Sequence, residues 1–322
     1  MSETLAVRAE GLTKRYGVLT AVDGISMRVA QGEVYGVLGP NGAGKTTFLR
    51  MLFGLIRPDA GTLEVFGRSW DRDGTAALDG VAGFIESPRF YPYLSGRRNL
   101  QLLAGLDGGA GASRIDEVLD VVDLTGREGD KVAGYSFGMR QRLGVAASLL
   151  RDPRLLVLDE PANGLDPAGI RDMRALVKRL AGSGLTVLLS SHDMDEVEEI
   201  CDNVTIMRAG TVVYHGTIAT LREQAPEPAY QLTTSDDPAA LALAHGRPGL
   251  SVAPADGALA VRGAQHRVDS YVTELVRRGI VPRSLVLHEA PLESLFFLLT
   301  ESSPGAPPGG TGPIPALTGA RR

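Results

Sequence analysis

The feature that most constrains this chain is a glycine-rich segment that ends in a lysine and two threonines. Its residues are Gly39, Pro40, Asn41, Gly42, Ala43, Gly44, Lys45, Thr46 and Thr47, and they fit the pattern G-x-x-x-x-G-K-[ST]. An apolar run of strand length, Val34–Leu38, precedes the segment, and Phe48–Phe53 has the character of a helix. A loop of this kind between a strand and a helix cradles phosphates. The sequence therefore predicts a site for a nucleoside triphosphate.

Two side chains of this loop have chemistry that suits a triphosphate. Lys45 would place a positive charge beside the β- and γ-phosphates, and the Thr46 hydroxyl is a suitable ligand for Mg²⁺. The glycines let the backbone turn tightly, so that successive N–H groups point toward the phosphates. A chance glycine-rich loop is the alternative, and the flanking strand and helix make it much weaker.

Composition limits the remaining possibilities. The chain has 322 residues, of which 43% are hydrophobic, which is enough for two domains with sizeable cores. Its net charge of −5 argues against a general nucleic-acid surface, and its single cysteine, Cys201, excludes an intrachain disulfide or a multi-thiolate metal site. The start of the sequence has no secretory signal, and no apolar run approaches the roughly 20 residues that span a bilayer. We expect a cytoplasmic protein.

The order of apolar runs predicts an α/β fold. Two runs, Ala6–Ala9 and Ile25–Val29, precede the strand of the phosphate site, which favours an antiparallel sheet beside the main one. Residues 87–150 have mostly helical patterns and predict a helical subdomain. Strands alternating with helices predict a largely parallel core sheet. These further strands are expected at Thr62–Phe66, Val81–Ile85, Arg154–Leu158, Leu185–Leu189 and Val204–Met207.

A second pattern begins after Pro226-Glu227-Pro228. We expect a nucleotide-binding domain over residues 1–220 and a small C-terminal domain over residues 228–300. The order of its elements, β-α-β-β-α-β with a closing helix, predicts a ferredoxin-like α+β unit. Residues 301–322 are rich in glycine and proline, which predicts a disordered tail.

Two acids end one of the buried strands. Asp159 and Glu160 follow Leu155–Leu158, at the edge of an open α/β sheet where ligands bind. There Asp159 would hold Mg²⁺ through its water shell, and Glu160 would polarise the attacking water. Two acids that merely end a strand are the alternative, and the phosphate loop makes that alternative weak.

The segment Tyr135–Arg142 ends 17 residues before Asp159 and resembles the signature of ABC-transporter ATPases. The resemblance covers Leu5–Gly216 and implies a P-loop NTPase cassette that uses ATP and Mg²⁺. It assigns Lys45, Glu160 and His192 to catalysis, with His192 sensing the γ-phosphate. By the same resemblance the nucleotide is also contacted by Tyr16, which stacks on adenine, by Ser136 and Gly138 of the signature, and by Asp166 in the loop that touches the other protomer. The other four histidines match no motif.

Two departures from the family pattern identify a branch. Glu86 stands where the family has glutamine, and Tyr135–Met139 stands where it has Leu-Ser-Gly-Gly-Gln. Both are similar to the bacitracin-resistance and daunorubicin-exporter branch, as is Pro291–Phe296, which looks like that branch's closing helix. A carboxylate is a good ligand for a hard cation, so we expect Glu86 to join Thr46 and Asp159 on the metal side of the nucleotide.

The resemblance implies an ATPase that forms a homodimer through its nucleotide sites and powers a separate membrane permease. From the branch, the permease would export an antibiotic, a drug or another hydrophobic substrate, and the ATPase would sit peripherally on the inner face of the membrane. The main alternative is an ABC ATPase that acts on nucleic acid or the ribosome. Such members carry coiled-coil insertions, zinc thiolates or two cassettes, which this sequence lacks, so no nucleic acid is expected. A P-loop kinase or GTPase is disfavoured by Tyr135–Arg142.

Overall fold

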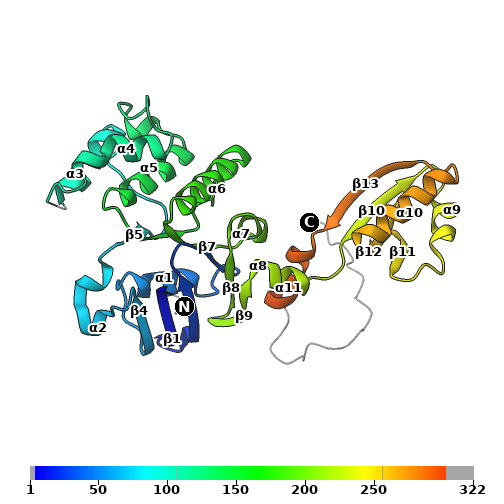
Figure 1. Ribbon diagram of the computed structural model, residues 1–322, viewed down its shortest axis with the longest axis horizontal. Coiled ribbons are helices and arrows are strands. Elements are labelled where there is room, and N and C mark those ends of the chain that lie inside the picture. Colours follow the sequence, from blue (N-terminus) through cyan, green and yellow to red (C-terminus); the bar gives the residue numbers. More distant parts are fainter. Residues whose placement is uncertain (1–3, 107, 256, 302–322) are drawn as a thin grey trace.

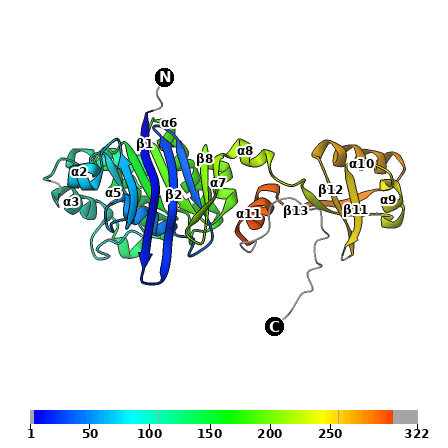
Figure 2. The same cartoon turned by 90° about the horizontal axis from the view of Figure 1, so that it is seen from below.

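The computed structural model describes residues 4–106, 108–255 and 257–301 (Figure 1). The predicted tail, apart from residue 301, lies outside these residues. Within them the chain forms three sheets: a six-stranded sheet, a three-stranded sheet beside it and a four-stranded sheet near the C-terminus. Figures 1 and 2 show the first two sheets in one large body and the third in a smaller one.

The six-stranded sheet has the order β5-β6-β7-β3-β8-β9. Its first five strands run parallel, so the sheet is largely parallel, as predicted, and it is mixed because β9 pairs antiparallel with β8. Every residue of β3, β6 and β7 is buried, because helices or a second sheet cover both faces. The strands are β3 (Val34–Leu38), β5 (Val81–Phe84), β6 (Leu155–Asp159), β7 (Thr186–Ser191), β8 (Asn203–Arg208) and β9 (Thr211–Thr217).

The predicted antiparallel sheet has the order β2-β1-β4. It contains β1 (Leu5–Tyr16), β2 (Leu19–Ala30) and β4 (Ala60–Val65), and its first two strands are 12 residues long. The sequence predicts only their most apolar parts. Exposed polar residues such as Arg8 and Glu10 alternate with buried ones there, so an apolar run marks less than the full strand.

Helices cover both faces of the main sheet. One core cluster joins the sheet to the helical subdomain, and a second joins it to α1 and the antiparallel sheet. Figure 1 shows these two layers on opposite sides of the strands. The helices are α1 (Lys45–Leu52), α2 (Trp70–Asp73), α3 (Gly96–Leu106), α4 (Ile115–Val121), α5 (Phe137–Leu149), α6 (Pro167–Gly182), α7 (Met194–Ile200) and α8 (Ile218–Glu223), with short 3₁₀ turns at Gly74–Leu78, Ala112–Arg114 and Val132–Gly134.

The C-terminal sheet has the order β11-β12-β10-β13, and every pairing in it is antiparallel. Helices α9 and α10 share its core with side chains such as Leu232, Val261 and Tyr271. This is the ferredoxin-like arrangement that the sequence predicts. Its elements are β10 (Ala229–Thr234), α9 (Asp237–Ala244), β11 (Leu250–Ala255), β12 (Ala258–Gly263), α10 (Gln265–Arg277) and β13 (Pro282–Glu289).

The last helix, α11 (Pro291–Glu301), packs on the large body instead of on the ferredoxin-like sheet. Leu292 and Phe296 are buried in the same core cluster as the helical subdomain. The backbone carbonyl of Leu299 accepts a hydrogen bond of 3.2 Å from Arg208 on β8. The structure thus differs from the predicted unit of residues 228–300, because an amphipathic pattern predicts a helix without indicating which core it enters.

No helix in the described ranges combines the length and the apolar character needed to cross a membrane.

Candidate functional site

The phosphate loop lies between β3 and α1, as predicted, and α1 begins at Lys45. Two of its glycines are required by close backbone contacts. A Cβ atom at Gly39 would lie 2.4 Å from the carbonyl oxygen of Met207, and one at Gly44 would lie 2.4 Å from that of Ala21. Gly44 also has a φ of 103°, which a side chain would strain. These close contacts and this backbone conformation fix the shape of the loop.

Lys45 is a buried lysine whose ammonium group points back toward the loop. Its Nζ donates a hydrogen bond of 2.7 Å to the carbonyl oxygen of Gly39 and lies 3.1 Å from a carboxylate oxygen of Glu160. The acid that follows β6 thus faces the lysine that begins α1. The two predicted residues come together because parallel strands end at one edge of the sheet.

Thr46 and Asp159 offer a pair of oxygen ligands. The Thr46 hydroxyl donates a hydrogen bond of 3.0 Å to one carboxylate oxygen of Asp159, and Ser190 donates one of 2.5 Å to the other. A hydroxyl and a carboxylate are the hard ligands that Mg²⁺ prefers, so the residues present fit the predicted ion. The described ranges hold no group of three or more acidic, histidine or cysteine side chains that could bind a metal alone. Phosphate oxygens and water would complete such a shell.

Glu160 connects three parts of the site. Besides its ion pair with Lys45, its carboxylate lies 3.2 Å from Nδ1 of His192 and accepts a hydrogen bond of 3.1 Å from the amide of Asn163. Its φ of 47° is uncommon for a residue with a side chain. Its backbone N–H donates to Ser190 on the neighbouring strand. The site therefore fixes the direction of this carboxylate from several sides.

Glu86 occupies a different position from the other predicted metal ligands. Its side chain is 62% exposed and forms an ion pair of 2.6 Å with Arg50 on α1. Within the described ranges, no hydrogen bond joins it to Thr46 or Asp159. Arg50 is a residue that the sequence reasoning missed. Its position one helical turn after Thr46 is the signal that could have revealed it.

The signature residues lie outside this network. Ser136 accepts a hydrogen bond of 3.2 Å from the N–H of Met139 and so caps α5, while Asp166 caps α6 through the N–H of Gly169. The ring of Phe137 lies against the loop between β6 and α6. A Cβ atom added at Gly164 in that loop would be 3.5 Å from the ring. In the described part of the chain, no hydrogen bond or ion pair joins Ser136, Gly138 or Asp166 to the phosphate loop. One chain does not bring all the predicted nucleotide contacts together.

Tyr16, the predicted adenine contact, lies at the end of β1 and is 47% exposed. The ammonium group of Lys14 lies 5.7 Å from the centre of its ring. A tyrosine that only filled the core would be buried, so its exposure suits a stacking surface. By contrast, His215, which matches no motif, is exposed on β9, and its Nδ1 lies 2.8 Å from the hydroxyl of the buried Tyr35.

The fold and this cluster of side chains define a P-loop NTPase cassette. The chain matches the ABC_tran family, described as "ABC transporter", over residues 22–163. It is 45% identical to the ABC transporter ATP-binding protein YdbJ of Bacillus subtilis over 63% of this chain and 66% of that one. It is 41% identical to the bacitracin transport ATP-binding protein BcrA of Enterococcus faecalis over 68% and 71% of the two chains. The protein therefore belongs to the ATP-binding proteins of ABC transporters.

Two further comparisons bear on the whole chain. The linearmycin resistance ATP-binding protein LnrL of Bacillus subtilis is 35% identical over 91% of this chain and 98% of that one, so the likeness extends into the C-terminal domain. The structure of cbiO1 from Clostridium perfringens, part of an ABC transporter complex, matches with a TM-score of 0.63 and 27% identity over 69% of this chain. The predicted family, its branch and its fold are confirmed.

Proposed function

We propose that this chain binds MgATP, hydrolyses it and thereby powers a separate membrane permease that exports an antibiotic, a drug or another hydrophobic compound. The observation that supports this most directly is the cluster of Lys45, Glu160 and His192 at one edge of the sheet. The names of the relatives BcrA and LnrL, which refer to bacitracin transport and linearmycin resistance, support the class of substrate. They favour transport over action on nucleic acid or the ribosome.

Each residue of the cluster has a distinct task in this proposal. Lys45 leaves Glu160 and neutralises the β- and γ-phosphates. Thr46 and Asp159 would hold Mg²⁺, which would supply further neutralisation of phosphate charge. Glu160, released from the lysine, orients the attacking water, and His192 contacts the γ-phosphate. Positioning and charge neutralisation account for most of the chemistry.

We propose further that two copies form a homodimer through their nucleotide sites. Ser136 and Gly138 would reach the phosphates bound by the other copy, and Asp166 would lie at the contact. The supporting observation is that these residues make no described contact with the phosphate loop of their own chain. Ser136 is exposed, which leaves its hydroxyl accessible to a second chain.

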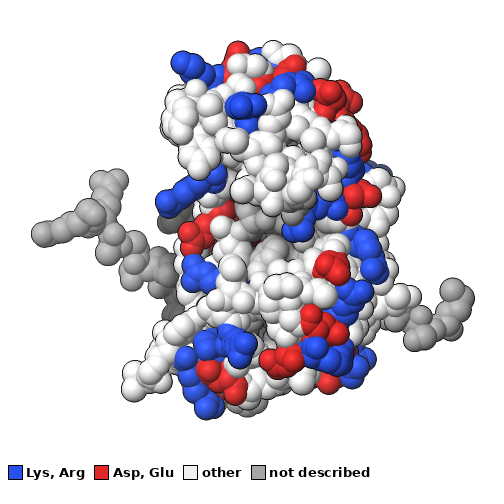
Figure 3. Space-filling model, turned by 90° about the vertical axis from the view of Figure 1, so that its left-hand side faces the viewer, with Lys and Arg blue, Asp and Glu red and all other residues white. Residues whose placement is uncertain are grey.

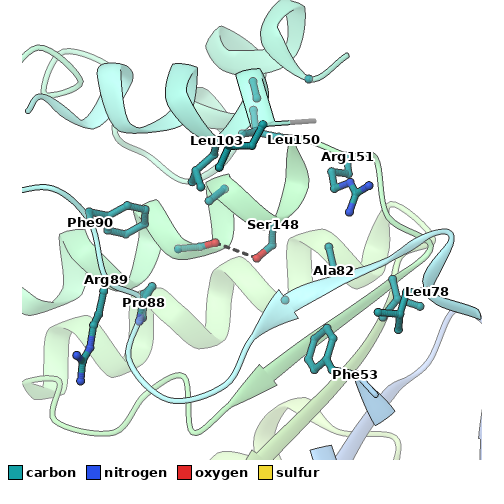
Figure 4. A pocket seen from close by; sticks show the side chains of 17 residues that line it. Phe53, Leu78, Ala82, Pro88, Arg89, Phe90, Leu103, Ser148, Leu150 and Arg151 are labelled. Carbon is teal, nitrogen blue, oxygen red and sulfur yellow. Dashed lines mark hydrogen bonds between the residues drawn. The ribbon is translucent and has the colours of Figure 1, made fainter. Parts of the chain in front are cut away.

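The proposed docking surface for the permease is a pocket of about 460 Å³ between β5 and the helices α3 and α5 (Figure 4). Phe90, Leu103 and Leu150 give it an apolar lining, and Arg89 and Arg151 lie at its sides. Leu106, which also lines the pocket, is exposed, as is Leu102 on the same helix α3. Figure 3 shows a broad uncharged area at this end of the molecule, bordered by both basic and acidic residues. Such a surface suits an apolar permease segment that carries an acidic side chain.

The remaining predictions complete the proposal. Residues 1–220 would form the catalytic cassette, and the ferredoxin-like unit would stabilise or regulate the dimer. Glu86 would move from Arg50 toward the metal when nucleotide binds. The protein would stay on the cytoplasmic side of the membrane, held there by its permease.

The test is to express the chain with a candidate multi-span permease from the same genome. We expect the two to purify together and cells that hold both to resist an antibiotic. The variant Leu103→Glu should release the permease while ATP binding remains. The control Leu55→Glu, at an exposed residue outside the pocket lining, should keep both permease binding and ATP binding. A chain that fails to hydrolyse ATP with its membrane partner present would refute the proposal.

A further inference from the structure

One edge of the C-terminal sheet is an unprotected strand. β13 is the last strand in the order β11-β12-β10-β13, and Figure 1 shows it along the outer margin of the small body. The opposite edge strand, β11, contains Pro254, which lacks the N–H needed for pairing. In β13 the only proline is its first residue, Pro282. A strand edge of this kind is a template for pairing with another chain.

The middle of β13 is apolar and exposed on both faces. Leu285 is 39% exposed, Val286 57% and Leu287 48%. Leu285 pairs with Leu232, which is fully buried beneath the helices, so Leu285 and Leu287 lie on the helix-covered face. Val286 pairs with Gln231 and lies on the other face. The apolar layer of the domain therefore extends to its last strand and stops there without a cover.

We propose that β13 pairs antiparallel with β13 of a second copy of this chain, which joins the two four-stranded sheets into one. The strand is suited to pairing with itself. Its central segment, Ser284–His288, has a polar residue at each end and the apolar sequence Leu-Val-Leu between them. This pattern is symmetric about Val286. An interface between identical chains related by a two-fold axis requires such self-complementarity.

The symmetry selects one register. With the two-fold axis at Val286, Leu285 of one chain faces Leu287 of the other, and the two Val286 side chains face each other. With the axis at Leu285, Leu287 would face Arg283 and Val286 would face Ser284. The first register buries all three apolar residues of each strand against apolar neighbours. The second leaves two of them against polar side chains.

Other occupants fit this edge less well. Residues 302–322 contain repeated prolines, which cannot donate ladder hydrogen bonds. The proposed permease surface involves α3, at the opposite end of the molecule from β13 (Figure 1). A second copy is already required by the proposed homodimer. The choice of a second copy as the partner of β13 rests on the proposed function. The observation that the edge of β13 is exposed does not depend on it.

The experiment is disulfide cross-linking of the full chain with Val286→Cys. Directly opposed Cα atoms in antiparallel strands lie about 4.5–5.5 Å apart, which is within the range that a disulfide spans. The native Cys201 is buried, and burial raises the pKa of its thiol, so it contributes little background. We expect most of the Val286→Cys chain to run as a dimer without reductant. The matched control, Ser251→Cys on the exposed opposite edge strand β11, should form no disulfide-linked dimer.

A second change tests the register. Adding Leu287→Lys to Val286→Cys should cut the cross-linked yield by about tenfold or more, because a charge would enter the apolar contact. Leu55→Lys, an exposed site in the cassette, should leave the yield unchanged. A yield for Val286→Cys no higher than that of Ser251→Cys overturns the proposal. An unchanged yield with Leu287→Lys, or cross-linking to the permease instead of a second copy, also overturns it.

The outcome is separable from the proposed function. Gel filtration of Glu160→Gln combined with Leu287→Lys, run with and without MgATP, reports the nucleotide dimer independently of β13, because the added lysine disrupts the strand pairing. If gel filtration shows the nucleotide dimer but Val286→Cys gives no cross-link, only the proposed pairing of β13 is refuted. Cross-linking at Val286 without a nucleotide dimer removes the homodimer through the nucleotide sites and leaves the strand pairing in place.

Discussion

Lys45 and Glu160 form an ion pair, with the lysine ammonium 3.1 Å from the carboxylate. The lysine is buried, and the carboxylate is mostly shielded from solvent. In the proposed mechanism both groups need other partners, a phosphate for the lysine and a water for the acid. In that mechanism, a triphosphate bound in the loop would displace Glu160 from Lys45. The same step would make the carboxylate available for catalysis.

This exchange predicts the behaviour of Glu160→Gln. An amide cannot compete as a counter-ion for Lys45, so the variant should bind ATP at least as tightly as the native chain. Without a carboxylate to orient water, turnover should fall by about a hundredfold or more. Binding of a fluorescent ATP analogue and phosphate release would measure the two effects. Gel filtration with MgATP should show a stable dimer, and native turnover in this variant would rule out the assigned role.

The sequence predicts this pairing only in outline. The phosphate loop and the end of β6 are each recognisable, and the parallel sheet brings them to one edge. The contact between Arg50 and Glu86 is harder to predict, because it depends on the backbone at Glu86, where φ is 65°. The strand β9 was missed, since its residues are half exposed and its ends are polar. The docking of α11 could not be predicted, because two apolar cores compete for one amphipathic helix.

The second prediction concerns Arg50 and Glu86. Arg50 offsets the charge of Glu86, so Arg50→Ala should leave an unbalanced acid near the phosphates and raise the Mg²⁺ concentration needed for ATP binding. Glu86→Gln should lower that requirement. It should also change permease-stimulated turnover more than basal turnover. The double variant Arg50→Ala, Glu86→Gln should resemble Glu86→Gln alone, because Arg50 affects Mg²⁺ dependence only by balancing the charge of Glu86.

Titration of Mg²⁺ against ATP binding in the native chain and the three variants would check this. Shifts of the two single variants in the same direction would contradict the balance of charges. Four superimposable curves would return Glu86 to a solvated strand end without a role at the metal.

The third prediction tests where α11 belongs. Phe296 is 6% exposed in the core of the cassette, and its neighbour Phe297 is 45% exposed. Phe296→Ala should lower the free energy of unfolding of the cassette by about 3 kcal/mol. Phe297→Ala should change it by less than about 0.5 kcal/mol. The chain has one tryptophan, Trp70 in α2, so its fluorescence during urea unfolding reports on the cassette. Equal transitions for the two variants would place α11 outside the cassette core.

The last prediction concerns Glu196 on α7, four residues after His192. It is 4% exposed, and one carboxylate oxygen accepts a hydrogen bond of 2.6 Å from Ser191. The other oxygen is buried and has no hydrogen-bond partner among the described residues. Burial raises the pKa of this carboxyl above its ordinary value of 4.5, with a smaller contribution from Asp193, while Ser191, Arg174 and His192 oppose the rise. The ionised acid is therefore a cost to the folded state.

The sign of the pH dependence follows from that shift. A raised pKa means that the folded chain binds the proton more tightly, so this contribution to stability is complete below the ordinary pKa and is lost as pH rises through the folded value. Glu196→Gln keeps the shape without the charge. It should unfold at a higher temperature than the native chain at about pH 8, and the difference should shrink toward about pH 5.

Glu199, on the same helix, is the matched control, because its pKa is shifted the opposite way. Arg174 and Lys178 pair with this exposed carboxylate and lower its pKa. Its contribution to stability is present above the ordinary pKa and is lost as pH falls. Glu199→Gln should therefore be less stable than the native chain by a similar margin at about pH 8 and about pH 5, because this contribution is lost only below the ordinary pKa of 4.5. Thermal unfolding of the three proteins across this range decides the matter. If Glu196→Gln loses stability at the alkaline end as Glu199→Gln does, the ionised Glu196 is held favourably, and burial is not the dominant effect on its charge.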